Sequence, residues 1–146
     1  MTLFFKKLKP AAVLPARATA GSAGYDLSAC IESPVVIRPG ETVRIPTGLA
    51  AYFDGGENVV LLVYPRSSLA TKFNITLPNC VGVVDSDYRG EILVALINLS
   101  KTDYTVLPAA RIAQLVVTPV LLPAVCEADE LPETARGAGG FGSTGR

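Results

Sequence analysis

Proline and glycine interrupt this chain at short intervals, with 11 prolines and 13 glycines among 146 residues. Proline breaks a helix interior and both residues favour turns, so long helices have little room. The segments between them are rich in Val, Ile, Leu, Thr and Tyr, which is typical of strands. We expect strands over 24–29, 35–38, 42–45, 48–53, 58–64, 80–84, 91–98, 103–106 and 111–119. With one short helix over 66–72, this pattern predicts an all-β sandwich or barrel.

The length fits one domain, because roughly 150 residues is a common domain size. Hydrophobic residues make up 49% of the chain and charged residues 18%, which excludes a disordered protein. The 13 basic and 13 acidic residues cancel, so we expect no basic face and no nucleic-acid partner. The longest apolar runs, 59–64 and 92–97, are far too short to cross a membrane.

The chain contains no histidine. This excludes Ser-His-Asp and Cys-His nucleophilic systems, and zinc sites that need imidazole. A general base must therefore be a carboxylate, lysine, tyrosine or cysteine, and a metal ion would be a hard cation on oxygen ligands. Three widely spaced cysteines, Cys30, Cys80 and Cys126, predict reduced thiols in a cytoplasmic protein rather than a disulfide framework.

Two strand candidates, 59–64 and 92–97, are apolar at successive positions and do not alternate. Strands of this kind are covered on both faces. In a chain this small, one of the covers is expected to be another subunit, so the sequence predicts an oligomer.

The last stretch, 133–146, differs from the rest because it holds five glycines, two hydroxyl residues after Phe141, and few apolar side chains. We expect a core over 1–132 and an arm over 133–146 that is mobile when nothing is bound. Residues 137–142 match the pattern GxGxxG by letter. They do not form a dinucleotide-binding motif, because no predicted strand precedes them and no predicted helix follows. The parts of the arm suit clasping a polyphosphate and stacking on a base; the alternative is a disordered terminus.

Asp85 follows a run of apolar residues and glycine in the segment 81–92. A carboxylate there is costly to bury unless it is paired or functional. Two interpretations stay open. Asp85 and Ser86 form a turn between two hairpin strands, or Asp85 is a general base aimed at water, with Asp87 on the same face of an extended chain.

Asp26 and the segment 65–70 carry further polar groups. Asp26 lies among small and apolar neighbours, and by itself reads as a structural aspartate at a strand edge. Arg66, Ser67 and Ser68 stand at the start of the short helix, where free backbone amides would hold phosphate. The alternative is ordinary capping of the helix by serine.

Arg111 and Gln114 lie on the last predicted strand. Their spacing has opposite parity, so a regular strand sends the two side chains to opposite faces. We therefore expect that they need not serve one site, and a buried glutamine bonded to backbone is the alternative for Gln114.

Taken in order, these segments resemble the trimeric dUTPase family, the deoxyuridine triphosphate nucleotidohydrolases. The matching motifs are AGYDLSA at 23–29, PRSSLA at 65–70, GVVDSDYRGEI at 82–92, RIAQLVV at 111–117 and RGAGGFGSTG at 136–145. The resemblance implies a distorted β jelly roll assembled as a homotrimer, with active sites at subunit boundaries. It also implies Mg²⁺-assisted hydrolysis of dUTP to dUMP and pyrophosphate, which limits uracil incorporation into DNA and supplies dUMP for dTMP synthesis.

The resemblance also implies a role for each matching residue. Asp85 would deprotonate the water that attacks the α-phosphorus, with Arg66 and Gln114 as the other catalytic residues. Asp26 would reach Mg²⁺ through water. The substrate would be bound by Ser67 and Ser68 at the phosphates, by Asn79, Gly82, Val83, Val84 and Leu93 at the uracil edge, by Tyr88 under the deoxyribose, and by Arg136, Phe141, Gly142, Ser143 and Thr144 of the arm.

Two other functions compete with this one. A dCTP deaminase shares the Arg-Ser-Ser segment, but its catalytic glutamate would fall at Ala95, which cannot relay protons. A non-catalytic jelly-roll trimer should lack the carboxylate or the arm, and this chain carries both. Phosphate-ester hydrolysis through Mg²⁺ also needs no histidine.

Overall fold

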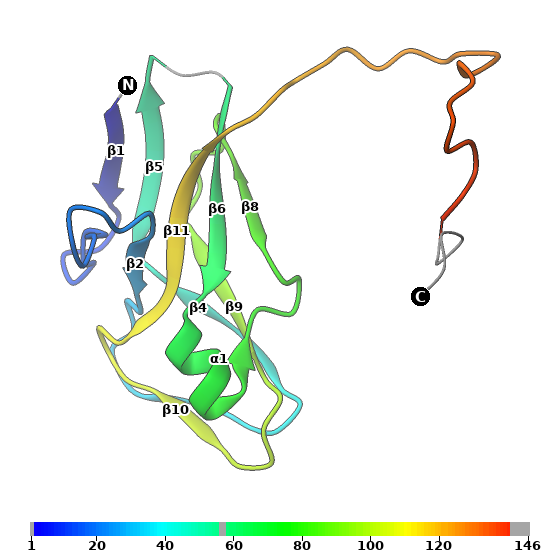
Figure 1. Ribbon diagram of the computed structural model, residues 1–146. Helices are drawn as coiled ribbons and strands as arrows, with labels where there is room; N and C mark the ends of the chain where they lie inside the picture. Colours follow the sequence, from blue (N-terminus) through cyan, green and yellow to red (C-terminus); the bar gives the residue numbers. More distant parts are fainter. Residues whose placement is uncertain (1, 56–57, 141–146) are drawn as a thin grey trace.

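Short strands provide nearly all of the regular secondary structure in the computed structural model, which describes residues 2–55 and 58–140 (Figure 1). The elements are β1 (Thr2–Lys7), β2 (Tyr25–Ser28), β3 (Val35–Ile37), β4 (Thr42–Pro46), β5 (Leu49–Asp54), β6 (Val59–Pro65), α1 (Ser67–Phe73), β7 (Ile75–Thr76), β8 (Gly82–Asp85), β9 (Leu93–Asn98), β10 (Tyr104–Val106) and β11 (Arg111–Pro119). The predicted all-β class with a short helix after Pro65 is confirmed.

The strands form antiparallel sheets with the orders β2-β11-β6-β8, β4-β9-β7, β1-β5 and β10-β3. The first two supply half of the buried side chains of the core. Leu61 and Leu115 of the four-stranded sheet and Val94 and Leu96 of the three-stranded sheet belong to one cluster of buried side chains. Each such side chain contributes about 1.5–3 kcal/mol when it is fully buried, so the core fixes how the two sheets face each other.

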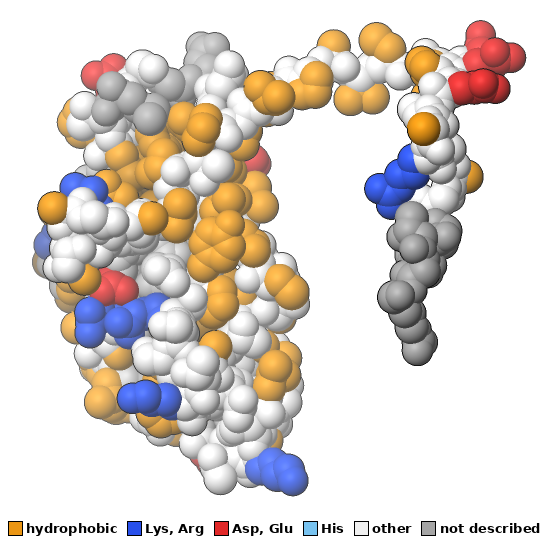
Figure 2. Space-filling model, in the orientation of Figure 1, with side chains coloured by type: hydrophobic (Ala, Val, Ile, Leu, Met, Phe, Trp, Pro, Cys, Tyr) orange, Lys and Arg blue, Asp and Glu red, His pale blue; other side chains and the backbone are white. Residues whose placement is uncertain are grey.

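The four-stranded sheet has a second apolar face, directed away from this core. Leu61 and Val63 point into the core, and side chains alternate along a strand. Every second position of β6, starting at Val60, therefore points outward, together with its partners on β8 and β11. We call this the outer face; it comprises Val60, Leu62, Tyr64, Val83 and Val116. Val83 is 64% exposed, and Figure 2 shows hydrophobic side chains gathered over β6 and β8. The double-sided apolar pattern of 59–64 thus corresponds to one core face and one face that is only partly open, because Val60 on it is 6% exposed.

Two strands were not expected from the sequence. β1 pairs with β5 along its whole length, from Thr2 opposite Asp54 to Lys7 opposite Leu49. Its closely spaced lysines hide an alternation in which Leu3 and Phe5 pack against the core. The two-residue β7 begins directly after Asn74, whose left-handed backbone (φ 54°) ends α1.

Beyond β11 the chain leaves the sheets. Residues 120–140 form no helix or strand and run away from the rest of the molecule (Figure 1). Leu121 and Val125 on this segment are 92% and 95% exposed. In the ranges that the structure covers, no helix is long and apolar enough to span a membrane.

Candidate active site

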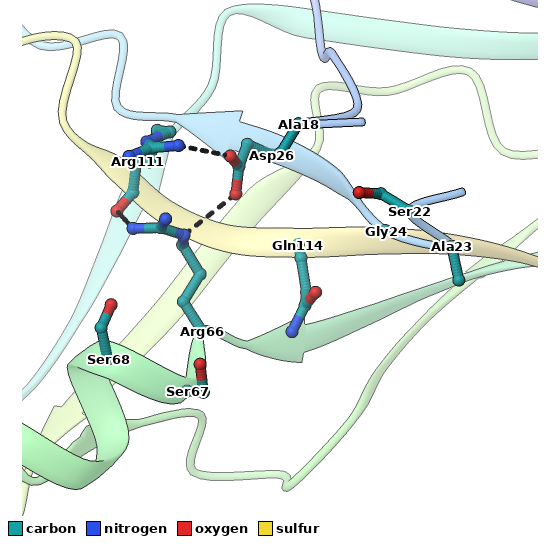
Figure 3. A pocket seen from close by; sticks show the side chains of 10 residues that line it. All are labelled: Ala18, Ser22, Ala23, Gly24, Asp26, Arg66, Ser67, Ser68, Arg111 and Gln114. Atoms are coloured by element: carbon teal, nitrogen blue, oxygen red, sulfur yellow. Dashed lines mark hydrogen bonds and ion pairs between the residues drawn. The ribbon is translucent and has the colours of Figure 1, made fainter. Parts of the chain in front are cut away.

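A polar cavity of about 390 Å³ lies where β2, β11 and the start of α1 meet (Figure 3). We call it the arginine pocket. Its lining consists of Ala18, Ser22, Ala23, Gly24, Asp26, Arg66, Ser67, Ser68, Arg111 and Gln114. Three of the segments singled out from the sequence, around positions 26, 66 and 114, therefore contribute to one cavity within a single chain.

Asp26 lies between two guanidinium groups. Arg66 Nε donates to Asp26 Oδ1 and Arg111 Nη1 donates to Asp26 Oδ2, each at 2.9 Å. Arg66 Nη1 also donates to the carbonyl oxygen of Arg111 at 3.4 Å. Two positive groups share one carboxylate, so this trio keeps one net positive charge, which favours an anion in the pocket.

The predicted separation of Arg111 and Gln114 onto opposite faces is wrong. The pairing between β11 and β2 shifts register between Arg111 and Ala113. An irregularity of this kind re-aims the side chains on either side of it, and both residues line the arginine pocket. Parity arguments fail at such a bulge, and a single sequence holds no signal for it.

Gln114 is fixed from two sides. Its Nε2 donates to the carbonyl oxygen of Pro65 at 3.1 Å, so the expected backbone-bonded glutamine is observed. Its Oε1 lies against Gly24, where an added Cβ would come within 2.6 Å of that oxygen. Gly24 is therefore needed to leave room for the Gln114 side chain in the pocket.

The start of α1 is not capped by serine. The N-cap residue is Arg66, with an extended backbone (φ −81°, ψ 136°), and no side chain in the described ranges caps the helix. The capping interpretation of this segment is therefore wrong. The hydroxyl groups of Ser67 and Ser68 instead line the arginine pocket beside the Arg66 guanidinium.

A second cavity, of about 220 Å³, lies between β8 and β9. We call it the β8–β9 cleft; it is lined by Val83, Val84, Asp85, Tyr88, Glu91, Ile92 and Leu93. The two strands on either side of Asp85, posed as hairpin strands in one interpretation, do not pair with each other in the described residues. Instead, β8 pairs with β6, and β9 pairs with β4 and β7. The facing edges of β8 and β9 therefore have peptide groups that no ladder between the two strands pairs, and these groups are available to the cleft.

The connection after β8 is folded by its own hydrogen bonds. The Tyr88 amide donates to the carbonyl oxygen of Asp85 at 3.2 Å, and the Tyr88 hydroxyl donates to the carbonyl oxygen of Glu91 at 3.2 Å. Asp85 thus takes part in a turn, and its exposed carboxylate is open to solvent. The turn and the general base, posed as alternatives, are compatible.

The chain does not bring Asp85 to the arginine pocket. Asp85 lies opposite Val60 on β6, and Gln114 lies opposite Tyr64 on the same strand. These two positions are four residues apart, or about 13 Å along a strand, and they face the same side of the sheet. The chain therefore holds two separate polar sites at the ends of its outer face.

The remaining residues assigned by resemblance lie elsewhere or outside the described ranges. Asn79 is exposed in the turn before β8 and its carbonyl oxygen accepts from Val81 N at 2.7 Å. Arg136 lies on the extended C-terminal segment, where its Nε donates to the carbonyl oxygen of Gly139 at 2.8 Å. Phe141, Gly142, Ser143 and Thr144 are not among the described residues. Sequence reasoning missed Arg111 and Glu91 as lining residues.

The pocket chemistry suits a metal ion held mainly by substrate. The described residues bring together no three carboxylates or cysteines that could hold a metal ion. Both oxygens of Asp26 accept from arginine, but each retains lone-pair capacity for water. Mg²⁺ keeps several waters and commonly binds substrate phosphates, so Asp26 and the Gln114 amide oxygen fit outer contacts to such an ion.

Comparison with known proteins supports one family. The sequence model of the family described as dUTPase matches residues 11–145. A deoxyuridine 5'-triphosphate nucleotidohydrolase of Coxiella burnetii is 50% identical over 141 residues, which cover 97% of this chain and 92% of that protein. The enzyme of the same description from Burkholderia multivorans is 47% identical over 133 residues, covering 91% and 89%.

Solved structures agree with the sequence comparison. A mutant dUTPase of Staphylococcus bacteriophage 80alpha, crystallised with dUpNHpp, aligns with a TM-score of 0.88 and 26% identity over 99% of both chains. A mutant dUTPase from phage phi11 of S. aureus, studied for its structural Mg(II) ion, aligns with a TM-score of 0.81 over 91% of this chain and 100% of that chain, at 23% identity.

Proposed function

The chain belongs to the dUTPase family and is a dUTP nucleotidohydrolase, and we propose that it converts dUTP to dUMP and pyrophosphate by attack of water on the α-phosphorus. Mg²⁺ bound to the triphosphate is the proposed cofactor. The reaction limits uracil incorporation into DNA and supplies dUMP for dTMP synthesis. The free thiols of Cys30, Cys80 and Cys126 support a cytoplasmic location.

The main support for this proposal is that the arginine pocket and the β8–β9 cleft lie at opposite ends of the same outer face. We call them the two half-sites. The arginine pocket has the charge to hold phosphates, and the β8–β9 cleft has a carboxylate and open peptide edges. They are too far apart for one nucleotide to use Asp85 and Arg66 of the same chain in the reaction. In a homotrimer, whose subunits would cover the apolar outer faces, the cleft of one subunit meets the arginine pocket of a neighbour.

Phosphate binding falls to the arginine pocket. Arg66 offers a planar set of donors suited to phosphate oxygens, and the hydroxyls of Ser67 and Ser68 donate beside it. Bound Mg²⁺ supplies neutralisation of triphosphate charge. Asp26 and Gln114 would hold water molecules around such an ion. Asp26 also keeps the Arg66 guanidinium oriented through its bond to Nε at 2.9 Å.

The attacking water is activated by Asp85. Its exposed carboxylate accepts a proton from water as the water oxygen bonds to the α-phosphorus. The bond from that phosphorus to the bridging oxygen breaks, and pyrophosphate leaves with the bonding pair. Catalysis of phosphoryl transfer rests on positioning and electrostatics, and Gln114 contributes by orienting the water and the α-phosphate.

The base is read by peptide groups of the cleft. Gly82, Val83, Val84 and Leu93, with the Asn79 side chain, would pair with the donors and acceptors of the uracil edge. Peptide groups cannot rotate to suit cytosine, whose reversed pattern leaves them unpaired at a cost. Tyr88 packs under the deoxyribose, so a 2′-hydroxyl is excluded.

The proposed domain division is a core over 1–132 and an arm over 133–146. In the closed complex the arm covers a site built by neighbouring subunits. Phe141 would stack on uracil, and Arg136, Ser143 and Thr144 would grip the outer phosphates, with Gly142 also in contact with the substrate.

Mixing inactive subunits tests the shared site directly. Asp85→Asn and Arg66→Ala chains are each expected to be inactive as pure trimers. Trimers that contain both chains should regain dUTP hydrolysis, because some of their sites combine an intact Asp85 with an intact Arg66 from different chains. No recovery in mixed trimers of verified composition would mean that both residues serve one site from one chain.

A direct assay tests the reaction itself. Purified protein with Mg²⁺ is incubated with dUTP and, separately, with dCTP, and pyrophosphate and ammonia are measured. Pyrophosphate from dUTP alone is expected. Ammonia from dCTP would indicate a deaminase, and no product from either nucleotide would favour a non-catalytic trimer.

A further inference from the structure

We propose that Glu91 is a positioning residue that sets nucleobase specificity, because its carboxylate ties one wall of the β8–β9 cleft to the turn between β4 and β5. This inference rests on the proposed function, in which the cleft receives uracil. Glu91 lines the cleft, and its Oε1 accepts a hydrogen bond from the Gly48 amide at 2.7 Å.

The two residues of that turn and the first residue of β5 hold two successive residues of the cleft wall. We call Thr47, Gly48 and Leu49 the brace. Besides the bond from Gly48 to Glu91, the Thr47 hydroxyl donates to the carbonyl oxygen of Ile92 at 2.7 Å. The Ile92 amide donates to the carbonyl oxygen of Leu49 at 2.8 Å. Thr47 is fully buried and Ile92 nearly so, so water does not compete for these bonds.

The brace is itself fixed in the body of the protein. Gly48 has a left-handed backbone (φ 67°), and a Cβ there would lie 2.7 Å from Cys30 Sγ and 2.9 Å from Ala12 Cβ. Its carbonyl oxygen accepts from the Leu8 amide at 2.7 Å. A turn wedged against two other segments offers Glu91 an immobile donor.

The brace acts where regular pairing stops. The ladder between β4 and β9 ends with Pro46 opposite Leu93, while the opposite wall, β8, is held by β6. Because the walls share no ladder within the described chain, cleft width depends on what holds each wall separately. At Glu91 and Ile92, which precede Leu93 and lie outside that ladder, the support comes from the brace.

Glu91 also supports the sugar-facing side of the cleft. The Tyr88 hydroxyl donates to its carbonyl oxygen at 3.2 Å, and the Tyr88 ring occupies the space that a Cβ on Gly90 would need. Movement of residue 91 would therefore move Tyr88. Loss of the Glu91 carboxylate should loosen a cleft whose fixed width excludes the methyl group of thymine.

The test is the ratio of kcat/KM for dUTP to kcat/KM for dTTP. The concentration of active enzyme cancels in this ratio, so partial unfolding does not change it. Glu91→Ala should lower the ratio about tenfold, within the range by which one methyl group is discriminated in a pocket. Glu91→Gln keeps an oxygen acceptor for the Gly48 amide and should stay within about twofold of the parent protein. The exposed Glu32→Ala is the matched control.

A second pair of variants tests the brace without touching Glu91. Thr47→Val removes the donor to Ile92 and should lower the same ratio, whereas Thr47→Ser retains the hydroxyl and should not. An unchanged ratio in both Glu91→Ala and Thr47→Val would overturn the inference while leaving the proposed function intact. Failure of the parent protein to hydrolyse dUTP would instead overturn the proposed function.

Discussion

In the arginine pocket, side chains from three segments reach one another directly, and Asp26 accepts from both Arg66 and Arg111 at 2.9 Å. In the β8–β9 cleft, the two walls come from strands that do not pair with each other in the described chain, and they are held from behind by β6, β4 and the brace. The pocket is thus built for charge and the cleft for shape. A phosphate can be held by flexible charged groups, whereas telling uracil from other bases needs donors and acceptors that cannot move.

The sharpest test of this contrast removes Asp85, the acidic group of the cleft that is proposed to act as the general base. Asp85→Asn should keep the fold and lower kcat for dUTP by about 10²–10⁴-fold, because a positioned general base contributes that much. The measurement is kcat, with a thermal melt to verify folding. A folded variant with near-normal kcat would mean that the cleft supplies shape alone.

Removal of the arm tests whether the two half-sites suffice. Deletion of 136–146 should leave trimer assembly intact and lower dUTP hydrolysis by about 10²-fold, since misplaced substrate costs roughly this much. Light scattering gives the assembly state and pyrophosphate release the activity. Equal activity in the truncated protein would show that pocket and cleft hold the nucleotide without the arm.

A single methyl group in the arginine pocket should act through Gln114. Gly24→Ala places a Cβ within 2.6 Å of Gln114 Oε1 and should lower kcat about tenfold by displacing that side chain. Gly21→Ala is the matched control, because a Cβ there meets no atom within 4 Å. Equal kcat values for the two variants would mean that the position of Gln114 does not matter to the reaction.

The smallest effect is expected at Arg111, whose side chain is 56% exposed. Exposed ion pairs contribute little, so Arg111→Ala should raise KM for dUTP only about threefold, with kcat retained. Arg38→Ala, at another exposed arginine, serves as control, and KM at two salt concentrations is the measurement. A rise in KM far beyond about threefold would mean that Arg111 contributes more than an exposed ion pair and would make it a phosphate ligand.

The sequence predicted the fold class well because short β-rich segments between prolines and glycines are a local signal. Predicted and observed strands agree closely for 111–119 and 58–64, where apolar runs are long. β1 was missed because its lysines obscure the alternation of Leu3 and Phe5. The family followed from ordered motifs, and the comparisons confirm it.

The geometry of the site was less accessible. The register shift at Arg111 and the lack of pairing between β8 and β9 arise from contacts between distant segments, which one strand's periodicity does not encode. Glu91 was hidden for the same reason, since its partner Gly48 is 43 residues away in sequence. The sequence identified charged residues that stand in recognisable motifs, such as Arg66 and Asp85. It did not identify Glu91, which is proposed to act by holding the main chain in place.

The placement of both half-sites on the same side of one sheet has a quantitative consequence. If neither half can turn over nucleotide alone, the isolated chain is catalytically silent and every turnover requires association. Specific activity should then fall on dilution, with a steep concentration dependence set by the dissociation constant of the assembly. Peptides that occupy the outer face would inhibit by opposing association, without binding where the nucleotide binds.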